Sequence, residues 1–401
     1  MMNRSLYRYL IFIPLLCSAA IAVSGQRITL EEALSAAGAS LEYTVNKAEL
    51  KKANALTKTA MGLANTGIFA ENEDLQPGNA KGVLKIGVSQ SLEWPGVYKA
   101  RQQYFKEQAR YYELNTAAIE VQLKRDVRKA YYQLWYLQAR YQLYRQLDST
   151  YRALMEAATL RYQKGEAAGI EKIAAEMRFK ELQAQTTEVQ NEMRVQQQQL
   201  MLLLNTEQVL LPADLPLRKL TLPGAENGQP HPLLTLQEQN VNIATANIGV
   251  QKNAVKPELS GRFFSQALYG MKNPYSGFSV SVGIPIFNMG ANKNKVLAAQ
   301  AETEAQQKSL EWQMQKLEKQ KQQALTETAQ ADALVQYYED NGLSGADEII
   351  KAAIIGYKGG EIGFMELTQY LNQATDLQKN YLDALNRFNQ TVIQYLYFIH
   401  Q

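Results

Sequence analysis

The chain has 401 residues, with 42 Lys and Arg against 39 Asp and Glu, and a formal net charge of +3. Because its basic residues are spread along the chain rather than clustered, we expect no nucleic acid partner. Two histidines and the single cysteine Cys17 predict no metal site and no cofactor. No GxSxG, HExxH or phosphate-loop motif is present, so the sequence predicts a protein that is not an enzyme.

Residues 1–25 have the pattern of a secretory signal peptide. Two arginines precede an apolar run from Leu10 to Val23, and small residues follow it. The run is too short to span a membrane as a helix. Because Leu16 precedes Cys17 where a lipoprotein signal has a small residue, we expect no lipidation.

The rest of the chain carries an internal duplication. The segment Tyr162–Glu166 resembles Tyr357–Glu361, 195 residues later, and in the same register Glu171 falls on Glu366. Matches that persist in one register indicate a repeat. Five of the 11 prolines lie between residues 206 and 232, which predicts a linker without regular helix. The sequence therefore predicts a first repeat at 26–205, a linker at 206–231 and a second repeat at 232–401.

Each repeat contains a segment in which apolar and polar residues alternate, at 84–94 and at 278–286. This period of two predicts strands with one apolar face, and their length suits a tilted transmembrane strand. Trp94 and Phe287 close these strands, where an aromatic belt at a membrane interface would place them. A soluble, half-buried sheet would show the same alternation.

Two fainter segments, Met61–Phe69 and Leu259–Ala267, are predicted to pair with these strands through turns at 74–79 and 270–274. The result is four strands in each chain. Four strands cannot close a barrel, because the smallest outer-membrane barrels have eight. Three chains would supply twelve strands, so the strand count predicts an oligomer.

The region from Val97 to about Leu160 has no proline and predicts a helix about 95 Å long. Each repeat then turns at Gly165 or Gly360 and returns as a helix to about residue 205 or 399. Apolar residues at heptad-like spacing mark a packing seam in each long helix. These residues are Val127, Tyr131, Leu134 and Tyr141 in the first repeat, and Leu310, Met314 and Leu317 in the second.

This arrangement resembles the TolC-type outer-membrane efflux family. The resemblance rests on the duplicated order of strands and helices, the strand ending Ile284–Gly290 and the two Tyr-x-x-Gly turns. It implies a mainly α protein with a membrane β-barrel, in which a homotrimer forms a 12-stranded barrel continued by a 12-helix periplasmic tunnel. The segment 380–390 is similar to members that serve heavy-metal pumps of the RND type.

The resemblance also implies a location and partners. The chain would lie in the outer membrane of a Gram-negative bacterium, in contact with its lipid. Its tips would dock a periplasmic adaptor (a membrane fusion protein) that connects to an inner-membrane RND-type pump. By their motif, the docking residues would be Gly165, Glu166, Gly360 and Glu361. Alternatively, each glycine only lets the chain turn between two helices.

A pore constriction is implied just past the second tip, where members of the family carry two acids three residues apart. Here these positions are Glu366 and Gln369. A ring of three Glu366 carboxylates would attract cations. Alternatively, Glu366 stabilises the first turn of its helix through the macrodipole.

A closed-state lock is implied by the same resemblance. In the family, a Tyr and an Arg on one hairpin bond to an acid on its neighbour. These positions correspond to Tyr357 and Glu171, whereas Ile362 stands at the arginine position. Because Ile362 cannot form an ion pair, we expect a weaker or rearranged lock.

The function implied is a passive exit duct that carries substrates from the adaptor and pump to the exterior. Two alternatives remain from the sequence, a periplasmic adaptor and a structural coiled coil. Adaptors carry one helical hairpin between all-β domains, and a coiled coil would lack the alternating strands. Both alternatives therefore fit the duplicated pattern less well.

Overall fold

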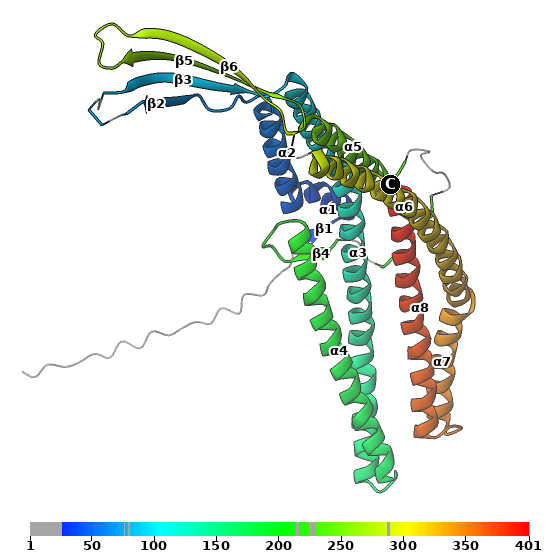
Figure 1. Ribbon diagram of the computed structural model, residues 1–401. Helices are drawn as coiled ribbons and strands as arrows, with labels where there is room; N and C mark the ends of the chain where they lie inside the picture. The colour runs from blue at the N-terminus through cyan, green and yellow to red at the C-terminus, as the bar shows by residue number, and fades with distance from the viewer. Residues whose placement is uncertain are drawn as a thin grey trace, which may run out of the picture.

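The structure is a computed structural model that describes residues 26–75, 77–78, 81–213, 216–223, 230–286 and 289–400. The predicted signal peptide and Phe287 lie outside the described residues. The molecule is elongated: two β-hairpins project at one end and two helical hairpins run to the other (Figure 1). In chain order the elements are β1 (Gln26–Ile28), α1 (Leu30–Ala36), the 3-10 turn η1 (Ala37–Ala39), α2 (Leu41–Thr59), β2 (Gly67–Glu73), β3 (Val83–Leu92), α3 (Pro95–Gln163), α4 (Gly169–Leu203), β4 (Leu210–Pro212), α5 (Pro232–Asn253), β5 (Glu258–Leu268), β6 (Tyr275–Gly283), α6 (Met289–Tyr337), the π-helical turn η3 (Tyr338–Gly342), α7 (Leu343–Gly359) and α8 (Phe364–Phe398).

The predicted long helices are confirmed. Helix α3 has 69 residues, which corresponds to a length of about 100 Å. It starts with Pro95 in its first turn, where proline costs no hydrogen bond. Helices α4 and α8 have 35 residues each and begin and end 195 positions apart, which is the offset of the sequence repeat. The duplication therefore extends to the helix boundaries.

The four longer strands form one antiparallel sheet in the order β2-β3-β5-β6. The pairing of β3 with β5 joins the first repeat to the second. The predicted strand at Met61–Phe69 is wrong in its first half, because β2 starts at Gly67, which pairs with Ser89. The strands predicted at 84–94 and 278–286 extended too far, because Trp94 and Ile286 lie beyond the ends of β3 and β6. Pro285 accounts for the end of β6, because proline has no N–H for the ladder.

The register gives this sheet two chemically different faces. Neighbouring positions across the four strands place apolar side chains on one face, and Ile68 and Phe278 on this face are 84% and 81% exposed. The opposite face is polar and carries two ion pairs, Arg262 with Glu71 and Lys85 with Glu73. The exposed members of the apolar face are Ile68, Leu84, Ile86, Val88, Leu92, Phe263, Phe278, Val280 and Val282.

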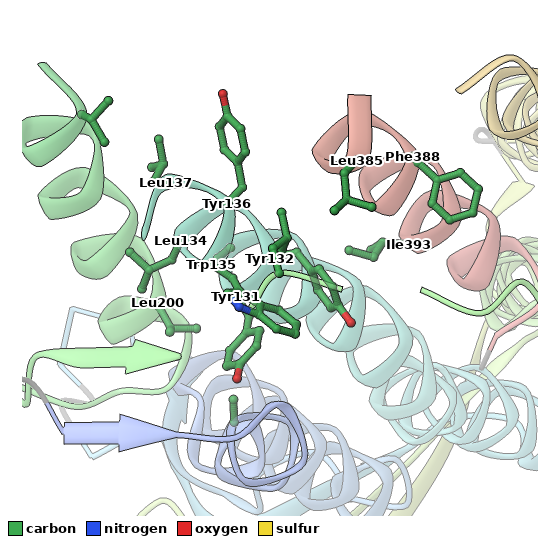
Figure 2. Packing of buried hydrophobic residues seen from close by; sticks show 14 of the residues in the cluster. Tyr131, Tyr132, Leu134, Trp135, Tyr136, Leu137, Leu200, Leu385, Phe388 and Ile393 are labelled. Carbon is green, nitrogen blue, oxygen red and sulfur yellow. The ribbon is translucent and has the colours of Figure 1, made fainter. Parts of the chain in front are cut away.

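The main hydrophobic core lies midway along the helices. Figure 2 shows aromatic residues of α3 packed between Leu200 of α4 and Leu385 of α8. Tyr131 is fully buried there, and its hydroxyl donates to the carbonyl of Ile28 in β1 at 3.0 Å. The first predicted seam therefore packs in this core, whereas Met314 of the second seam is exposed.

The linker between the repeats is anchored to this core. Its residues 210–212 form β4, which pairs in parallel with β1. Asn389 of α8 is 0% exposed; its amide donates to the carbonyl of Arg218 at 2.9 Å and accepts from the N–H of Leu220 at 2.8 Å. The described part of the linker contains no helix. Helices α1, α2 and α5 were not predicted from the sequence.

None of the helices in the described part of the chain is long and apolar enough to cross a membrane.

Candidate functional site

The two hairpin tips have the same backbone conformation. Gly165 and Gly360 both have left-handed φ angles, +74° and +76°, which a residue with a Cβ adopts only with strain. At each tip the glycine N–H donates to the tyrosine carbonyl three residues earlier, at 3.0 Å and 3.2 Å. The next residue, Glu166 or Glu361, donates its N–H to the carbonyl five residues earlier at 2.9 Å. These bonds form a Schellman motif, which ends a helix by satisfying its last carbonyls.

The tips present charged and apolar groups to the surroundings. Gly165, Glu166, Gly360 and Glu361 are all exposed. Large apolar side chains near them are also exposed, and clusters of this kind mark contact surfaces for other proteins. They are Leu160, Tyr162, Ile170, Ile173, Met177, Ile355 and Met365.

Arg161, near the end of α3, connects the two tips. Its Nη1 donates to the hydroxyl of Tyr357 in α7 at 2.9 Å, across 196 positions of the sequence. The same Nη1 lies 3.9 Å from Oε2 of Glu171 in the first turn of α4. The arginine also donates weakly to the carbonyl of Glu166 at 3.4 Å. One cation therefore brings together the two predicted lock residues, Glu171 and Tyr357.

Apolar contacts behind this network hold the two hairpins together. Phe364, the first residue of α8, is buried against Ala158 of α3 and Ala175 of α4. Its ring meets the Tyr357 ring edge-on, with centroids 6.3 Å apart. The position of the Tyr357 hydroxyl is therefore set by packing as well as by Arg161.

Comparisons with known proteins agree with this architecture. Residues 229–396 match the family model described as "Outer membrane efflux protein". The chain has the fold of a TolC-type outer-membrane efflux protein. The predicted resemblance to that family is confirmed. The family is one of transport proteins rather than of enzymes. No curated protein matches the sequence.

Three solved structures share the fold over nearly their whole length. A membrane protein from Pseudomonas aeruginosa has a TM-score of 0.77 at 16% identity, covering 92% of this chain and 90% of its own. CusC has a TM-score of 0.77 at 17% identity, covering 94% and 92%. The CmeC outer membrane channel of Campylobacter jejuni has a TM-score of 0.75 at 13% identity, covering 100% and 94%.

In this efflux-protein fold, the missing arginine of the second tip has a structural explanation. Ile362 packs in an apolar cluster with Ala353, Leu367 and Leu371 of the second hairpin. It also lies where a Cβ on Gly356 would make ordinary contact, at 3.6 Å. Ile362 stands at the predicted cation position, and the role of Arg161 was not predicted. The sequence feature that could have pointed to Arg161 is its position directly before Tyr162 of the first Tyr-x-x-Gly turn.

Glu366 and Gln369, the predicted constriction residues, are both exposed on α8. The carboxylate Oε2 of Glu366 accepts the N–H of Gly363 at 2.8 Å, so it caps the start of the helix. Glu366 therefore stabilises the start of α8 through a hydrogen bond that the sequence did not predict. This bond leaves one carboxylate oxygen and the negative charge facing outward.

Trp94 lies at the junction between β3 and α3 and is 43% exposed. The residue before it is held on both sides: the N–H of Glu93 donates to the Tyr98 hydroxyl at 3.0 Å, and its carboxylate pairs with Arg101 at 2.8 Å. These bonds fix the angle between strand and helix. Trp94 lies just beyond the end of the strand, and its place at a membrane interface stays a prediction.

His231 caps the helix that opens the second repeat. Its Nδ1 accepts the N–H of Leu233 at 3.2 Å, so Nε2 carries the proton and donates to the carbonyl of Tyr397 at 3.1 Å. The residue is 6% exposed, and this burial lowers the pKa of the imidazole to about 4. His231 is therefore neutral in the folded protein at pH 7.

Proposed function

We propose that this protein is the outer-membrane exit duct of a tripartite efflux system. Substrates would pass through it passively from a periplasmic adaptor and an inner-membrane RND-type pump to the exterior. The observation that carries this proposal is the sheet with one apolar exposed face and one polar face, continued by helices about 100 Å long. Such a sheet suits lipid on one side and water on the other.

The open edges of the sheet support the homotrimer that this proposal includes. Strands β2 and β6 stand at its two edges, and long open edges favour pairing with another chain. Lipid tolerates no unpaired backbone, so a four-stranded sheet in a membrane must close with other copies. Three copies would give twelve strands, and the four long helical segments of each chain would give a twelve-helix tunnel in the periplasm.

The tips are the proposed gate and docking surface. Gly165, Glu166, Gly360 and Glu361, with the exposed apolar side chains around them, would meet the adaptor. Glu366 and Gln369 would face the narrow end of the passage, where three carboxylates in a low-dielectric neck favour cations. Arg161, bonded to Tyr357 and near Glu171, would keep neighbouring hairpins together in the closed state.

A periplasmic adaptor or a structural coiled coil is the alternative. Neither class accounts for the exposed apolar face of the four-stranded sheet, because in water that face would promote aggregation. The efflux-protein family match also favours the duct.

The decisive experiment measures single-channel conductance of the purified protein in planar lipid bilayers. We expect small, cation-selective steps in the wild type and reduced cation selectivity in Glu366→Ala. The matched control is Glu348→Ala, which removes the same charge from an exposed site on α7. A folded oligomer that never inserts would contradict the duct and favour the adaptor. Pores with equal selectivity in all three proteins would remove Glu366 from the constriction.

A further inference from the structure

A pocket lies where the sheet of the second repeat meets its helices. It is lined by the end of α5, the segment after β6 and the first turns of α6. Its lining residues are Lys252, Val255, Ile284, Pro285, Ile286, Asn292, Lys293 and Val296. The pocket thus combines an apolar floor with two ammonium groups and an amide.

The charge of this pocket is unbalanced. Lys252 and Lys293 are exposed, and the part of the chain that the structure describes gives neither of them an ion-pair partner. No acid lines the pocket. The nearby acid Glu258 pairs in register with Gly283, on the polar side of the sheet. A ligand with an anionic head and an apolar tail would fit this combination.

The apolar floor continues into the apolar face of the sheet. Ile284 and Ile286 are exposed and follow Val282, the last apolar-face residue of β6. The lysines therefore stand at the helical end of the apolar surface, where a membrane would meet water. A lipid whose acyl chain lay along the strands would place its headgroup beside these two lysines.

The first repeat carries lysines at the corresponding positions. Lys58 and Lys99 precede Lys252 and Lys293 by 194 positions, and all four are exposed. Lys58 and Lys252 lie in the last turns of α2 and α5. We call these four lysines the basic collar.

Helix electrostatics explains only half of the basic collar. A cation in the last turn of a helix is favoured by the macrodipole, which accounts for Lys58 and Lys252. Lys99 and Lys293 are each the fifth residue of their helix, near the end where a cation gains nothing from the dipole. Their recurrence in both repeats calls for a negative partner outside the chain.

We propose that the basic collar binds the phosphate headgroups of anionic lipids in the leaflet on the helical side of the sheet, and so fixes the depth of the protein in the membrane. This inference rests on the proposed membrane location. Lysines near an anionic lipid surface each strengthen binding severalfold. The pocket at Lys252 and Lys293 would be the site at which one lipid is held individually.

Native mass spectrometry of the detergent-purified protein tests this proposal, with dioleoylphosphatidylglycerol as the probe and dioleoylphosphatidylcholine as the neutral comparison. We expect selective retention of the anionic lipid by the wild type. The variant K252Q/K293Q should bind it roughly 30-fold more weakly. The control K319Q/K351Q makes the same charge change on α6 and α7, far from the sheet, and should bind like the wild type.

Equal binding by K252Q/K293Q and the wild type would overturn the proposal, and so would equal loss in the control variant. Displacement of the lipid by millimolar inorganic phosphate alone would overturn the lipid assignment in favour of a free anion site. Bilayer conductance of the same preparations separates this inference from the duct. Pores without lipid selectivity would contradict only the collar, whereas a wild type that forms no pores would contradict the duct.

Discussion

The first and second hairpin tips share one backbone and differ in their side-chain contacts. Both turn at a left-handed glycine and close with the same pair of hydrogen bonds. At the first tip, Arg161 reaches outward to Tyr357 of the other hairpin. At the second tip the corresponding position is Gly356, and Ile362 packs inward in its own hairpin.

The difference teaches which parts of a duplicated sequence are constrained. A turn between antiparallel helices needs a residue that accepts positive φ, so Gly165 and Gly360 both remain glycine. The contact between the hairpins needs only one cation, and either tip could supply it. Here the first tip does so, and the two tips have become complementary rather than equivalent.

The entrances to the two repeats differ in a similar way. Ser40 caps α2 by accepting the N–H of Glu42 at 3.3 Å, and His231 caps α5 by accepting the N–H of Leu233 at 3.2 Å. Both caps accept from the second residue of the helix. Of these two capping groups only the imidazole can bind a proton, so acid should weaken the second cap alone.

The largest expected effect is a pH-dependent stability that arises from His231. Its pKa of about 4 in the folded protein is below the ordinary 6.5, so the unfolded chain binds the proton more readily. The contribution of neutral His231 to the free energy of unfolding is complete above pH 6.5 and is lost as the pH falls towards 4. Its upper limit is about 3 kcal/mol. Thermal melting in detergent at pH 7.5 and 4.5 measures it.

The variant His231→Asn keeps a capping acceptor without a proton-binding nitrogen. It should lose less stability than the wild type between these two pH values. Ser40→Asn is the matched control in the first repeat and should keep the wild-type pH dependence. If His231→Asn and the wild type respond equally to acid, the cap is not the source of the effect.

The second effect concerns the cation of the first tip. Arg161→Gln should destabilise the contact between the hairpins by about 1 kcal/mol, because Tyr357 and Glu171 lose their shared partner in a half-exposed site. Open-channel conductance should rise if this contact holds the duct closed. Arg110→Gln, which removes an exposed pair with Glu113 inside α3, is the control and should change neither property measurably. Equal effects of the two variants would contradict the role of Arg161 as a bridge.

The third effect tests whether the two turns are equivalent. Gly165→Ala and Gly360→Ala should each lower the free energy of unfolding by about 1 kcal/mol, because a residue with a Cβ is strained at positive φ. Gly345→Ala, inside α7 with open space around the added Cβ, should instead stabilise by about 0.5–1 kcal/mol. Melting temperatures of the three variants check both signs. A large difference between the two tip variants would show that their turns are not energetically alike.

The smallest expected effect on stability separates the two roles of Glu366. Glu366→Gln keeps an oxygen that can accept the N–H of Gly363, so the loss should be below about 0.5 kcal/mol. Cation selectivity should nevertheless fall, because the charge is gone. A drop in melting temperature with unchanged selectivity would show that Glu366 acts only as a helix cap.

Much of this fold was predictable from local patterns. The absence of proline after Val97 and the tip glycines predicted the long hairpins, and the alternation at 278–286 predicted an apolar sheet face. The 195-residue offset of the sequence repeat recurs in the bounds of α4 and α8. The predicted strand ends were less accurate. Pairing with a neighbouring strand, rather than alternation, decides that β2 begins at Gly67 and that β6 ends at Gly283.

The sequence by itself determined the periodicities, the turn positions and the two-fold repetition, because these depend on backbone preferences and on residues close in the chain. Only the tertiary structure decided that β3 pairs with β5, that Asn389 holds the linker, and that Arg161 meets Tyr357 across 196 positions. Such contacts depend on which surfaces meet when the two repeats pack together. No local pattern specifies that meeting, because the same arginine could pair with any acid or hydroxyl that the fold brings within reach.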